Sequence, residues 1–396
     1  MASPGTKPVV LHIGDPIKYN PETYKAFSSA FDVIRPSAAE RQRPEFIRAL
    51  RERRWGDFAA IFRPFWSTGG EMGKWDAELI SLLPASCRVF ASAGAGFDWA
   101  DTKLLGERGV IYCNGGLAAA ESVADFAVAL VISTFRHLAW GIAAATVPTL
   151  LSDRSGSGSD RSAAEAAFRF SHEHEVFHSR NPRGHVLGLI GLGKIGQVIG
   201  SKLGNPSMGM LLHYHDVVRR SPEEEARLGL TYHPTLASLL AASDCAVLCT
   251  PASADGKPLI DAAALAAFKP GGRFVNIARG SLVDEDALAD ALESGRVSAA
   301  GLDVHADEPR VSRRLLKFAG AEQIAGAGAE GGKIGPDGRA VNPGRVLLTC
   351  HNAGGTVETH IGFEELAMRN IMAVLEGKKA ITPVNMHFLN KRDSKL

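Results

Sequence analysis

The stretch that decides the fold runs from Val186 to Gly196 and reads VLGLIGLGKIG. Its first five residues form a short apolar run that is rich in branched side chains, and such a run predicts a buried strand. The next six have the spacing G-x-G-x-x-G, and a helical pattern, Gln197–Leu203, follows them. In this context Gly191 permits a tight turn, Gly193 lets the backbone approach a pyrophosphate, and the last glycine allows the helix to pack closely. The stretch therefore predicts a dinucleotide-binding domain.

An acidic residue stands where such a domain binds the adenosine ribose. Asp216 ends the next apolar run, twenty residues after Gly196. A carboxylate there accepts hydrogen bonds from the ribose hydroxyls of NAD and repels the 2′-phosphate of NADP. Arg219 and Arg220 follow, and a nearby guanidinium could accommodate that phosphate. We expect both arginines to be exposed, where their charge is screened, so the sequence favours NAD and leaves NADP possible.

Short apolar runs alternate with helical patterns along most of the chain. The runs before the deciding stretch are Val9–Ile13, Val33–Ile34, Ala59–Phe62, Val89–Ala91 and Val110–Cys113. Those after it are Leu211–His215, Cys245–Thr250, Arg273–Ile277, Ala299–Val304 and Val346–Thr349. The alternation predicts α/β architecture with two Rossmann-like, doubly wound, parallel-sheet domains. We assign residues 1–120 plus 356–396 to one domain and 121–355 to the NAD-binding domain.

Three segments depart from this alternation. A long helix is expected from about Glu121 to Ala145, where apolar residues are dense. Ser152–Ser162 is rich in Ser, Gly, Asp and Arg, which favours a flexible surface loop. Phe318–Arg345 has many Gly and Ala residues and few large apolar ones, so we interpret it as an insertion into the domain.

Charge and cysteine content narrow the possible partners. The net charge is +1, which gives no electrostatic reason to expect nucleic acid or an anionic membrane as partner. The longest apolar run, Phe126 to Trp140, is interrupted by Arg136 and His137, so we expect a buried helix and no membrane span. Five cysteines are present without a zinc-binding spacing, so we expect no metal site and a reducing compartment.

Three chemically capable residues follow predicted strands. Arg279 lies in Asn276-Ile-Ala-Arg-Gly280, Glu308 follows the run that ends at Val304, and His351 follows the last run. Ligands of open α/β sheets bind beyond the carboxyl ends of the strands. An arginine can grip a carboxylate at two points, and a histidine paired with a carboxylate can donate a proton near neutral pH. Together these residues indicate an acid catalyst beside a carboxylate clamp.

The order of these motifs resembles that of the D-isomer-specific 2-hydroxyacid dehydrogenase family. The glycine motif is followed by N-x-A-R-G, by D-V-x-x-x-E-P from Asp303 to Pro309, and by a late histidine with glycines behind it. The stretches Ala93–Trp99 and Asn181–Gly188 are most similar to the fungal D-mandelate dehydrogenase branch, which reduces bulky or aromatic 2-keto acids. The longer spacing from Glu308 to His351 departs from the family pattern because of the insertion.

The resemblance implies a role for each matching residue. It implies a substrate domain at 1–120 plus 356–396, with the active site in the cleft between the domains. The catalytic residues would be Arg279, Glu308 and His351. The groups that bind the substrate carboxylate would be Arg279 and the N–H groups of Gly94, Ala95 and Gly96. The residues along the cofactor would be Gly191, Gly193, Lys194, Ile195, Gly196, Asp216, Thr250, Ala278, Asp303, His351 and Gly354.

Two alternatives remain open at this point. A glyoxylate or hydroxypyruvate reductase shares every motif named above. A non-catalytic, NAD-sensing protein similar to the corepressors of this fold could also retain Arg279, Glu308 and His351. Consumption of reduced cofactor with a panel of 2-keto acids separates these possibilities. Phe65, Trp66 and Phe97 are the residues we expect in the substrate pocket, and we expect a homodimer.

The last three residues are Ser394-Lys395-Leu396, the tripeptide that the peroxisomal import receptor reads. We expect peroxisomal import, with the cytoplasm as the alternative location. Removing the tripeptide should leave the activity of the purified enzyme unchanged and move the protein to the cytosol. Imaging a fusion whose C-terminus is free tests this, and a diffuse cytosolic signal from the intact form would argue against import.

Overall fold

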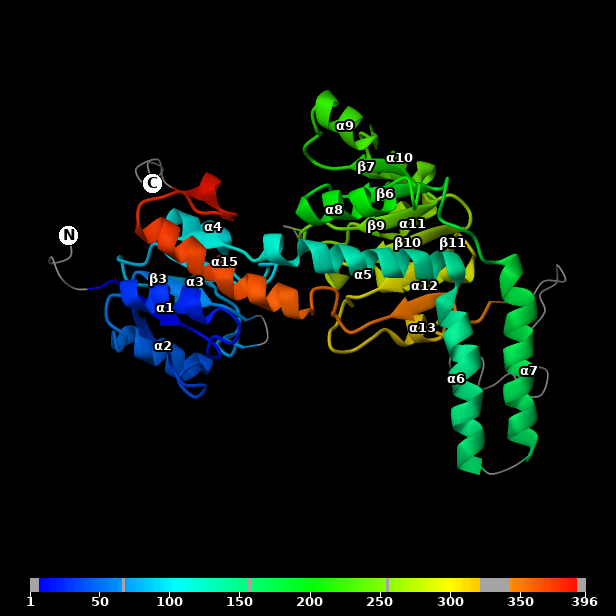
Figure 1. Ribbon diagram of the computed structural model, residues 1–396, viewed down its shortest axis with the longest axis horizontal. Coiled ribbons are helices and arrows are strands. Elements are labelled where there is room, and N and C mark those ends of the chain that lie inside the picture. Colours follow the sequence, from blue (N-terminus) through cyan, green and yellow to red (C-terminus); the bar gives the residue numbers. More distant parts are fainter. Residues whose placement is uncertain (1–6, 66–67, 156–157, 254–255, 321–341, 390–396) are drawn as a thin grey trace. The chain divides into compact units, whose positions relative to one another are not determined.

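The computed structural model describes residues 7–65, 68–155, 158–253, 256–320 and 342–389, without the side chains of 147–164. The chain forms two compact units, Met1–Ser122 with Gly354–Leu396, and Val123–Ala353. The boundaries expected from the sequence lie within two residues of these. Trp66 and the tripeptide Ser394–Leu396 lie outside the described residues. Each unit contains one parallel sheet, as predicted (Figure 1).

The first unit has a five-stranded sheet in the order β2-β1-β3-β4-β5. Its elements are β1 (Val9–His12), α1 (Pro21–Ala30), β2 (Asp32–Ile34), α2 (Arg43–Arg51), β3 (Ala60–Arg63), α3 (Ala77–Ser81), β4 (Val89–Ser92), α4 (Thr102–Glu107), β5 (Ile111–Cys113), α15 (Val357–Leu375) and the 3-10 turn η4 (Met386–Phe388). All positions of β3 and β4 are buried, because α1 and α15 cover one face and α2 and α3 cover the other.

The second unit has a seven-stranded sheet in the order β12-β11-β10-β9-β6-β7-β8. Its elements are α5 (Gly116–Arg136, which starts in the first unit), α6 (Leu138–Ser155), α7 (Gly158–His174), η1 (Glu175–Phe177), β6 (Val186–Ile190), α8 (Lys194–Leu203), β7 (Leu211–His215), α9 (Pro222–Leu228), β8 (Leu230–Tyr232), α10 (Leu236–Ala242), β9 (Cys245–Leu248), α11 (Ala262–Ala266), β10 (Gly272–Asn276), η2 (Gly280–Leu282), α12 (Glu285–Glu293), β11 (Val297–Leu302), α13 (Arg313–Leu316) and β12 (Val346–Leu348). The strand order reverses between β6 and β9, and ligands of such sheets bind at this switch point.

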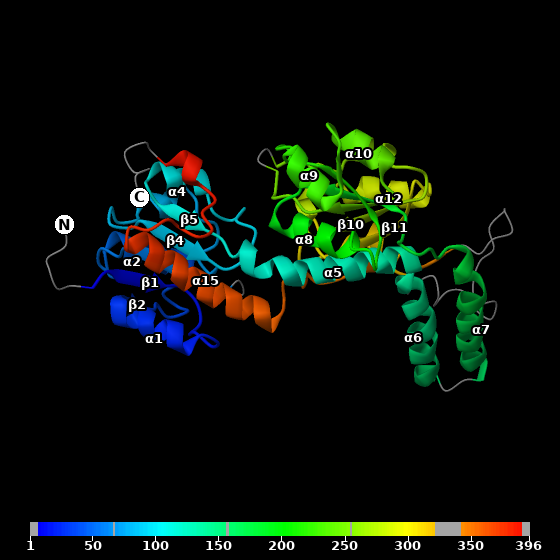
Figure 2. The ribbon, with the colours of Figure 1, turned by 45° about the horizontal axis from the view of Figure 1, so that its top comes forward.

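The prediction of one long helix over Glu121–Ala145 is wrong, because the helix is interrupted at His137. This residue has a φ of 49°, which lies in the left-handed region, and it separates α5 from α6. Its buried ring lies 2.7 Å from the Asn342 amide, and burial lowers the His137 pKa to about 4. The break redirects the chain, so α6 leaves the line of α5 (Figures 1 and 2).

The flexible loop expected at Ser152–Ser162 is also wrong. Helix α6 continues to Ser155 and α7 begins at Gly158, so most of this stretch is helical. The two helices run side by side away from the sheet in both views (Figures 1 and 2). Serine and glycine were poor predictors here because neighbouring helices can override the weak intrinsic preference of a short segment.

The insertion Phe318–Arg345 closes at its base, and residues 321–341 lie outside the described part of the chain. The Arg345 N–H donates to the Phe318 carbonyl at 2.8 Å, and its guanidinium lies 4.8 Å from the Phe318 ring centre. Val346, the first residue of β12, donates to the same carbonyl at 2.9 Å. These bonds return the chain to the sheet, so the insertion does not displace the strand before His351.

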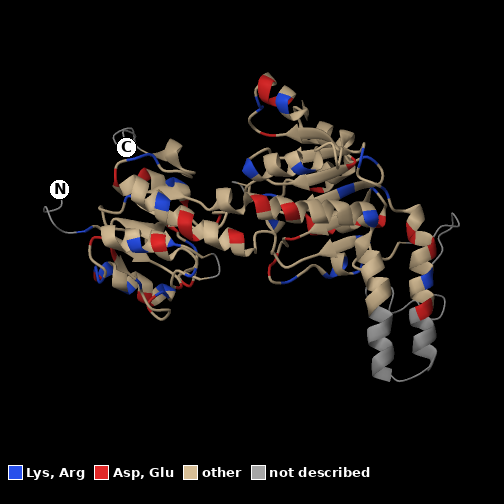
Figure 3. Cartoon of the chain, in the orientation of Figure 1, with Lys and Arg blue, Asp and Glu red and all other residues tan. Residues whose placement is uncertain are grey.

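Among the described helices, α5 is long and apolar enough to cross a membrane. Within the second unit its Leu130, Val131 and Phe135 side chains are at most 1% exposed, so its apolar side chains contribute to the core. Basic and acidic residues are intermixed over both units (Figure 3). This mixing accompanies the small net charge of +1.

Candidate active site

The three residues expected to be catalytic follow three adjacent parallel strands of the second unit. Arg279 comes after β10, Glu308 after β11 and His351 after β12, and β11 pairs with both neighbours. Parallel strands place their carboxyl ends at one edge of the sheet. The edge that carries these three side chains is therefore the edge at which the glycine loop after β6 also lies.

His351 and Glu308 form a hydrogen-bonded pair. The Nδ1 atom of His351 lies 2.9 Å from Oε2 of Glu308, and Oε1 accepts the backbone N–H of His305 at 3.0 Å. Desolvation by itself would raise the Glu308 pKa, but the hydrogen bonds from His351 and His305 outweigh it and hold the pKa below its usual value. The carboxylate thus stays ionised at neutral pH. Both side chains are partly exposed, so the free ring nitrogen of His351 is open to a ligand.

A buried carboxylate fixes the turn that carries His351. Asp303 is 1% exposed, and its Oδ1 accepts the Thr349 hydroxyl at 2.7 Å and the Asn352 N–H at 2.9 Å. Its Oδ2 accepts the Ala353 N–H at 2.8 Å, and its carbonyl accepts the His351 N–H at 2.7 Å. These bonds hold His351 at a φ of 57°, a strained value for a residue with a side chain.

The strand end before Arg279 is held by Asn276, which the sequence did not single out. Its side-chain oxygen accepts the Ala278 N–H at 2.9 Å, and its amide donates to the Arg279 carbonyl at 3.0 Å. A Cβ at Gly280 would lie 1.9 Å from the His305 carbonyl carbon. Only glycine therefore allows this strand end to lie against the segment that leads to Glu308. The asparagine of the N-x-A-R-G motif is the sequence feature from which this role at the strand end could have been predicted.

The backbone of the glycine loop leaves room for a ligand to approach closely. A Cβ at Gly193 would meet no atom within 4 Å, whereas one at Gly196 would lie 2.5 Å from the Gly191 carbonyl oxygen. Helix α8 begins at Lys194 without a side-chain cap, so its first N–H groups are available to an anion. The buried Thr250 hydroxyl has no hydrogen-bond partner among the described residues. These features fit a dinucleotide pyrophosphate at this loop.

The expectation that Arg219 and Arg220 are both exposed is wrong for Arg220. Arg219 is exposed, donates twice to Glu225 at 2.9 Å, and lies 4.8 Å from the Tyr232 ring centre. Arg220 is half-buried, and its Nη2 donates to the Leu192 carbonyl within the glycine loop. Asp216 accepts the Leu192 N–H at 2.7 Å, so Asp216 and Arg220 meet at one residue. The Tyr214 hydroxyl accepts the Arg220 N–H and fixes this arrangement.

The predicted substrate loop belongs to the first unit. Gly94 has a φ of 89°, and its carbonyl accepts the Gly115 N–H at 2.7 Å. The Asn114 amide donates to the Ala95 carbonyl at 2.7 Å, a contact that the sequence did not indicate. Of the expected pocket residues, Phe65 is buried near His360, and Phe97 packs on Tyr112. These contacts hold the loop that follows β4.

A doubly wound parallel sheet with a glycine loop at its switch point defines a dinucleotide-binding domain. Residues 152–324 match the NAD-binding domain of the D-isomer specific 2-hydroxyacid dehydrogenases. The chain is 31% identical over 342 residues to 4-methyl-2-oxopentanoate reductase A of Aspergillus oryzae, covering 86% of this chain and 88% of that protein.

Two solved structures are similar over nearly the whole chain. The holo form of Rhodotorula graminis D-mandelate dehydrogenase is 36% identical, with a TM-score of 0.79, over 96% of this chain and 98% of that one. A glyoxylate reductase from Paecilomyes thermophila is 29% identical, with a TM-score of 0.73, over 96% and 99%. The chain belongs to the D-isomer-specific 2-hydroxyacid dehydrogenase family and is an oxidoreductase that acts on CH–OH groups.

The anchoring role of Asp303 can be tested apart from catalysis. Asp303→Asn should lower the free energy of unfolding of the cofactor-free protein by about 1–3 kcal/mol, because an amide cannot accept all three donors. Urea unfolding measures this. Asp307→Asn is the matched control, since its ion pair with Arg310 is exposed and should change stability by less than about 0.5 kcal/mol. Equal free energies of unfolding for the two variants would show that Asp303 does not anchor the turn.

Proposed function

We propose that this enzyme reduces 2-keto acids with bulky or aromatic side chains to D-2-hydroxy acids. The observation that carries the proposal is the His351–Glu308 pair, 2.9 Å apart, beside the strand end that bears Arg279. The similarity to D-mandelate dehydrogenase and to 4-methyl-2-oxopentanoate reductase supports a branched or aromatic side chain on the substrate. The curated relatives are named as dehydrogenases and reductases, which supports an enzyme over a non-catalytic NAD sensor.

Each residue has a role in this proposal. The Arg279 guanidinium binds the substrate carboxylate at two points and polarises the keto oxygen. His351 donates a proton to that oxygen, and the ionised Glu308 orients the ring and stabilises its charged form. The bound dinucleotide supplies the hydride that reaches the carbonyl carbon. The N–H groups of Gly94–Gly96 remain predicted donors to the substrate carboxylate.

A glyoxylate or hydroxypyruvate reductase is the second candidate. The similarity to a glyoxylate reductase over 96% of the chain favours it. The two candidates require the same proton donor and the same carboxylate clamp. They differ in the size of the group attached to the keto carbon, so only a comparison of substrates separates them.

The substrate proposal is tested with a panel of benzoylformate, 4-methyl-2-oxopentanoate, hydroxypyruvate and glyoxylate. We expect kcat/KM to be highest for the first two, because a larger apolar group gains binding energy on burial. Loss of NADH absorbance gives the rates, and chiral analysis of the product gives the configuration. A preference for glyoxylate would favour the second candidate, and an L-product would contradict the first.

Two variants test the roles within the same panel. His351→Ala should lower turnover by about 10²–10⁴-fold, the usual contribution of a general acid, with cofactor affinity nearly unchanged. Arg279→Lys should lower both affinity and turnover, because an ammonium cannot reproduce a two-point grip. Near-normal turnover in either variant would exclude that residue from the proposed mechanism.

Cofactor preference provides a separate test. We expect NADH to be preferred over NADPH because Asp216 lies at the ribose position, and Asp216→Ala should reduce or reverse that preference. Arg220→Ala should lower kcat/KM for NADPH by about tenfold and leave NADH nearly unaffected, since a charged hydrogen bond contributes about 1.5–3 kcal/mol. Arg219→Gln is the matched control and should not discriminate between the cofactors. A wild-type preference for NADPH would show that Asp216 does not govern the choice.

A further inference from the structure

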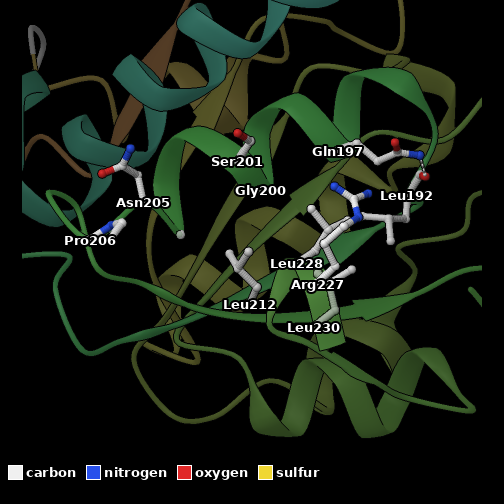
Figure 4. A pocket seen from close by; sticks show the side chains of 11 residues that line it. Leu192, Gln197, Gly200, Ser201, Asn205, Pro206, Leu212, Arg227, Leu228 and Leu230 are labelled. Atoms are coloured by element: carbon white, nitrogen blue, oxygen red, sulfur yellow. Dashed lines mark hydrogen bonds between the residues drawn. The ribbon is translucent and has the colours of Figure 1, made fainter. Parts of the chain in front are cut away.

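The second unit contains a cavity of about 270 Å³ between α8, α9, β7 and the edge strand β8. Its lining combines the apolar side chains of Leu192, Pro206, Leu212, Leu228 and Leu230 with the polar side chains of Gln197, Ser201, Asn205 and Arg227 (Figure 4). Pockets for drug-sized ligands have volumes of about 300–1,000 Å³, so this cavity has room only for a smaller ligand. It lies behind the glycine loop and includes none of the residues assigned to substrate chemistry.

One wall of the cavity carries a positive charge. Arg227, near the end of α9, has no ion pair or hydrogen bond with any other described residue. No Asp or Glu side chain lines the cavity. Figure 4 shows the guanidinium on the side of Gln197, with Leu212 and Pro206 further along the cavity. The cavity therefore combines one cationic side chain with an apolar wall formed by Leu212, Leu228 and Leu230.

We propose that this cavity binds a small monocarboxylate with a short apolar tail. The carboxylate pairs with the exposed Arg227 guanidinium. The tail occupies the space between Leu212, Leu228 and Leu230, where burial of its methyl and methylene groups favours binding. A nucleotide does not fit, because the space is small.

Leu192 connects the cavity to the cofactor loop. Its side chain lines the cavity, its N–H donates to Asp216, and its carbonyl accepts Gln197 at 3.1 Å and Arg220. A ligand that contacts Leu192 therefore changes the loop that binds the dinucleotide. Because coupling of two binding sites is reciprocal, the monocarboxylate and the cofactor must alter each other's affinity by the same factor.

The probe for the experiment is 4-methylpentanoate, which has neither a keto nor a hydroxyl group and cannot be turned over. The methyl NMR signals of Leu212, Leu228 and Leu230 in the full-length protein should shift and saturate at millimolar concentration. Arg227→Gln should weaken binding by about tenfold, and Ser201→Trp, which fills the cavity from an exposed helix position, should abolish it. Arg313→Gln, an exposed arginine on α13, is the matched control and should bind normally.

Two further measurements make the result decisive. The uncharged 4-methylpentanamide should bind more weakly than the acid, and the shifts should persist in Arg279→Ala, which separates this cavity from the proposed substrate site. The NADH dissociation constant should change when the cavity is saturated, and only in proteins that retain Arg227. Absence of shifts, or equal shifts in wild type and Arg227→Gln, overturns the proposal, and an unchanged NADH affinity overturns the coupling. Neither outcome depends on which 2-keto acid the enzyme reduces.

Discussion

The buried carboxylate of Asp303 is the contact on which the position of His351 beside Glu308 depends. It accepts one hydroxyl and two backbone N–H groups from residues 349–353, all on the far side of β12. A buried charge is stable only when it is fully hydrogen-bonded, so the turn has one favourable conformation. That conformation forces His351 to a positive φ and brings its ring to Glu308. The His351–Glu308 pair is thus positioned by a turn that the buried Asp303 side chain holds in one conformation.

Leu192 has a comparable position on the cofactor side of the unit. Its backbone accepts or donates three bonds, to Asp216, Gln197 and Arg220, and its side chain is buried. Asp216 accepts the N–H and Arg220 donates to the carbonyl, so opposite charges converge on one residue. We propose that the ribose end of a dinucleotide meets both of them, so that the choice between NAD and NADP would depend on Arg220 as well as on Asp216.

The sequence was sufficient to predict those features for which the backbone conformation requires a particular residue type. The glycine loop, the parallel strands and the strand-end positions of Arg279, Glu308 and His351 all follow from periodicity and from the known direction of parallel strands. The short edge strand β8 was not expected, because Leu230–Tyr232 has an exposed threonine between two partly buried residues and forms no apolar run. The break at His137 was missed because it depends on Asn342, 205 residues away. The burial of Arg220 depends likewise on Tyr214 and Leu192, and exposure of a charged side chain was the natural expectation.

This division explains how one fold accommodates different substrates. In the function proposed above, the groups that donate a proton or bind a carboxylate follow strand ends, and buried acceptors hold their backbone. The groups that would contact the substrate side chain do not take part in these bonds. The similarity of this chain to both a mandelate dehydrogenase and a glyoxylate reductase over 96% of its length fits that separation. Under the function proposed above, selectivity would change through residues of the predicted substrate pocket, while the His351–Glu308 pair keeps its geometry.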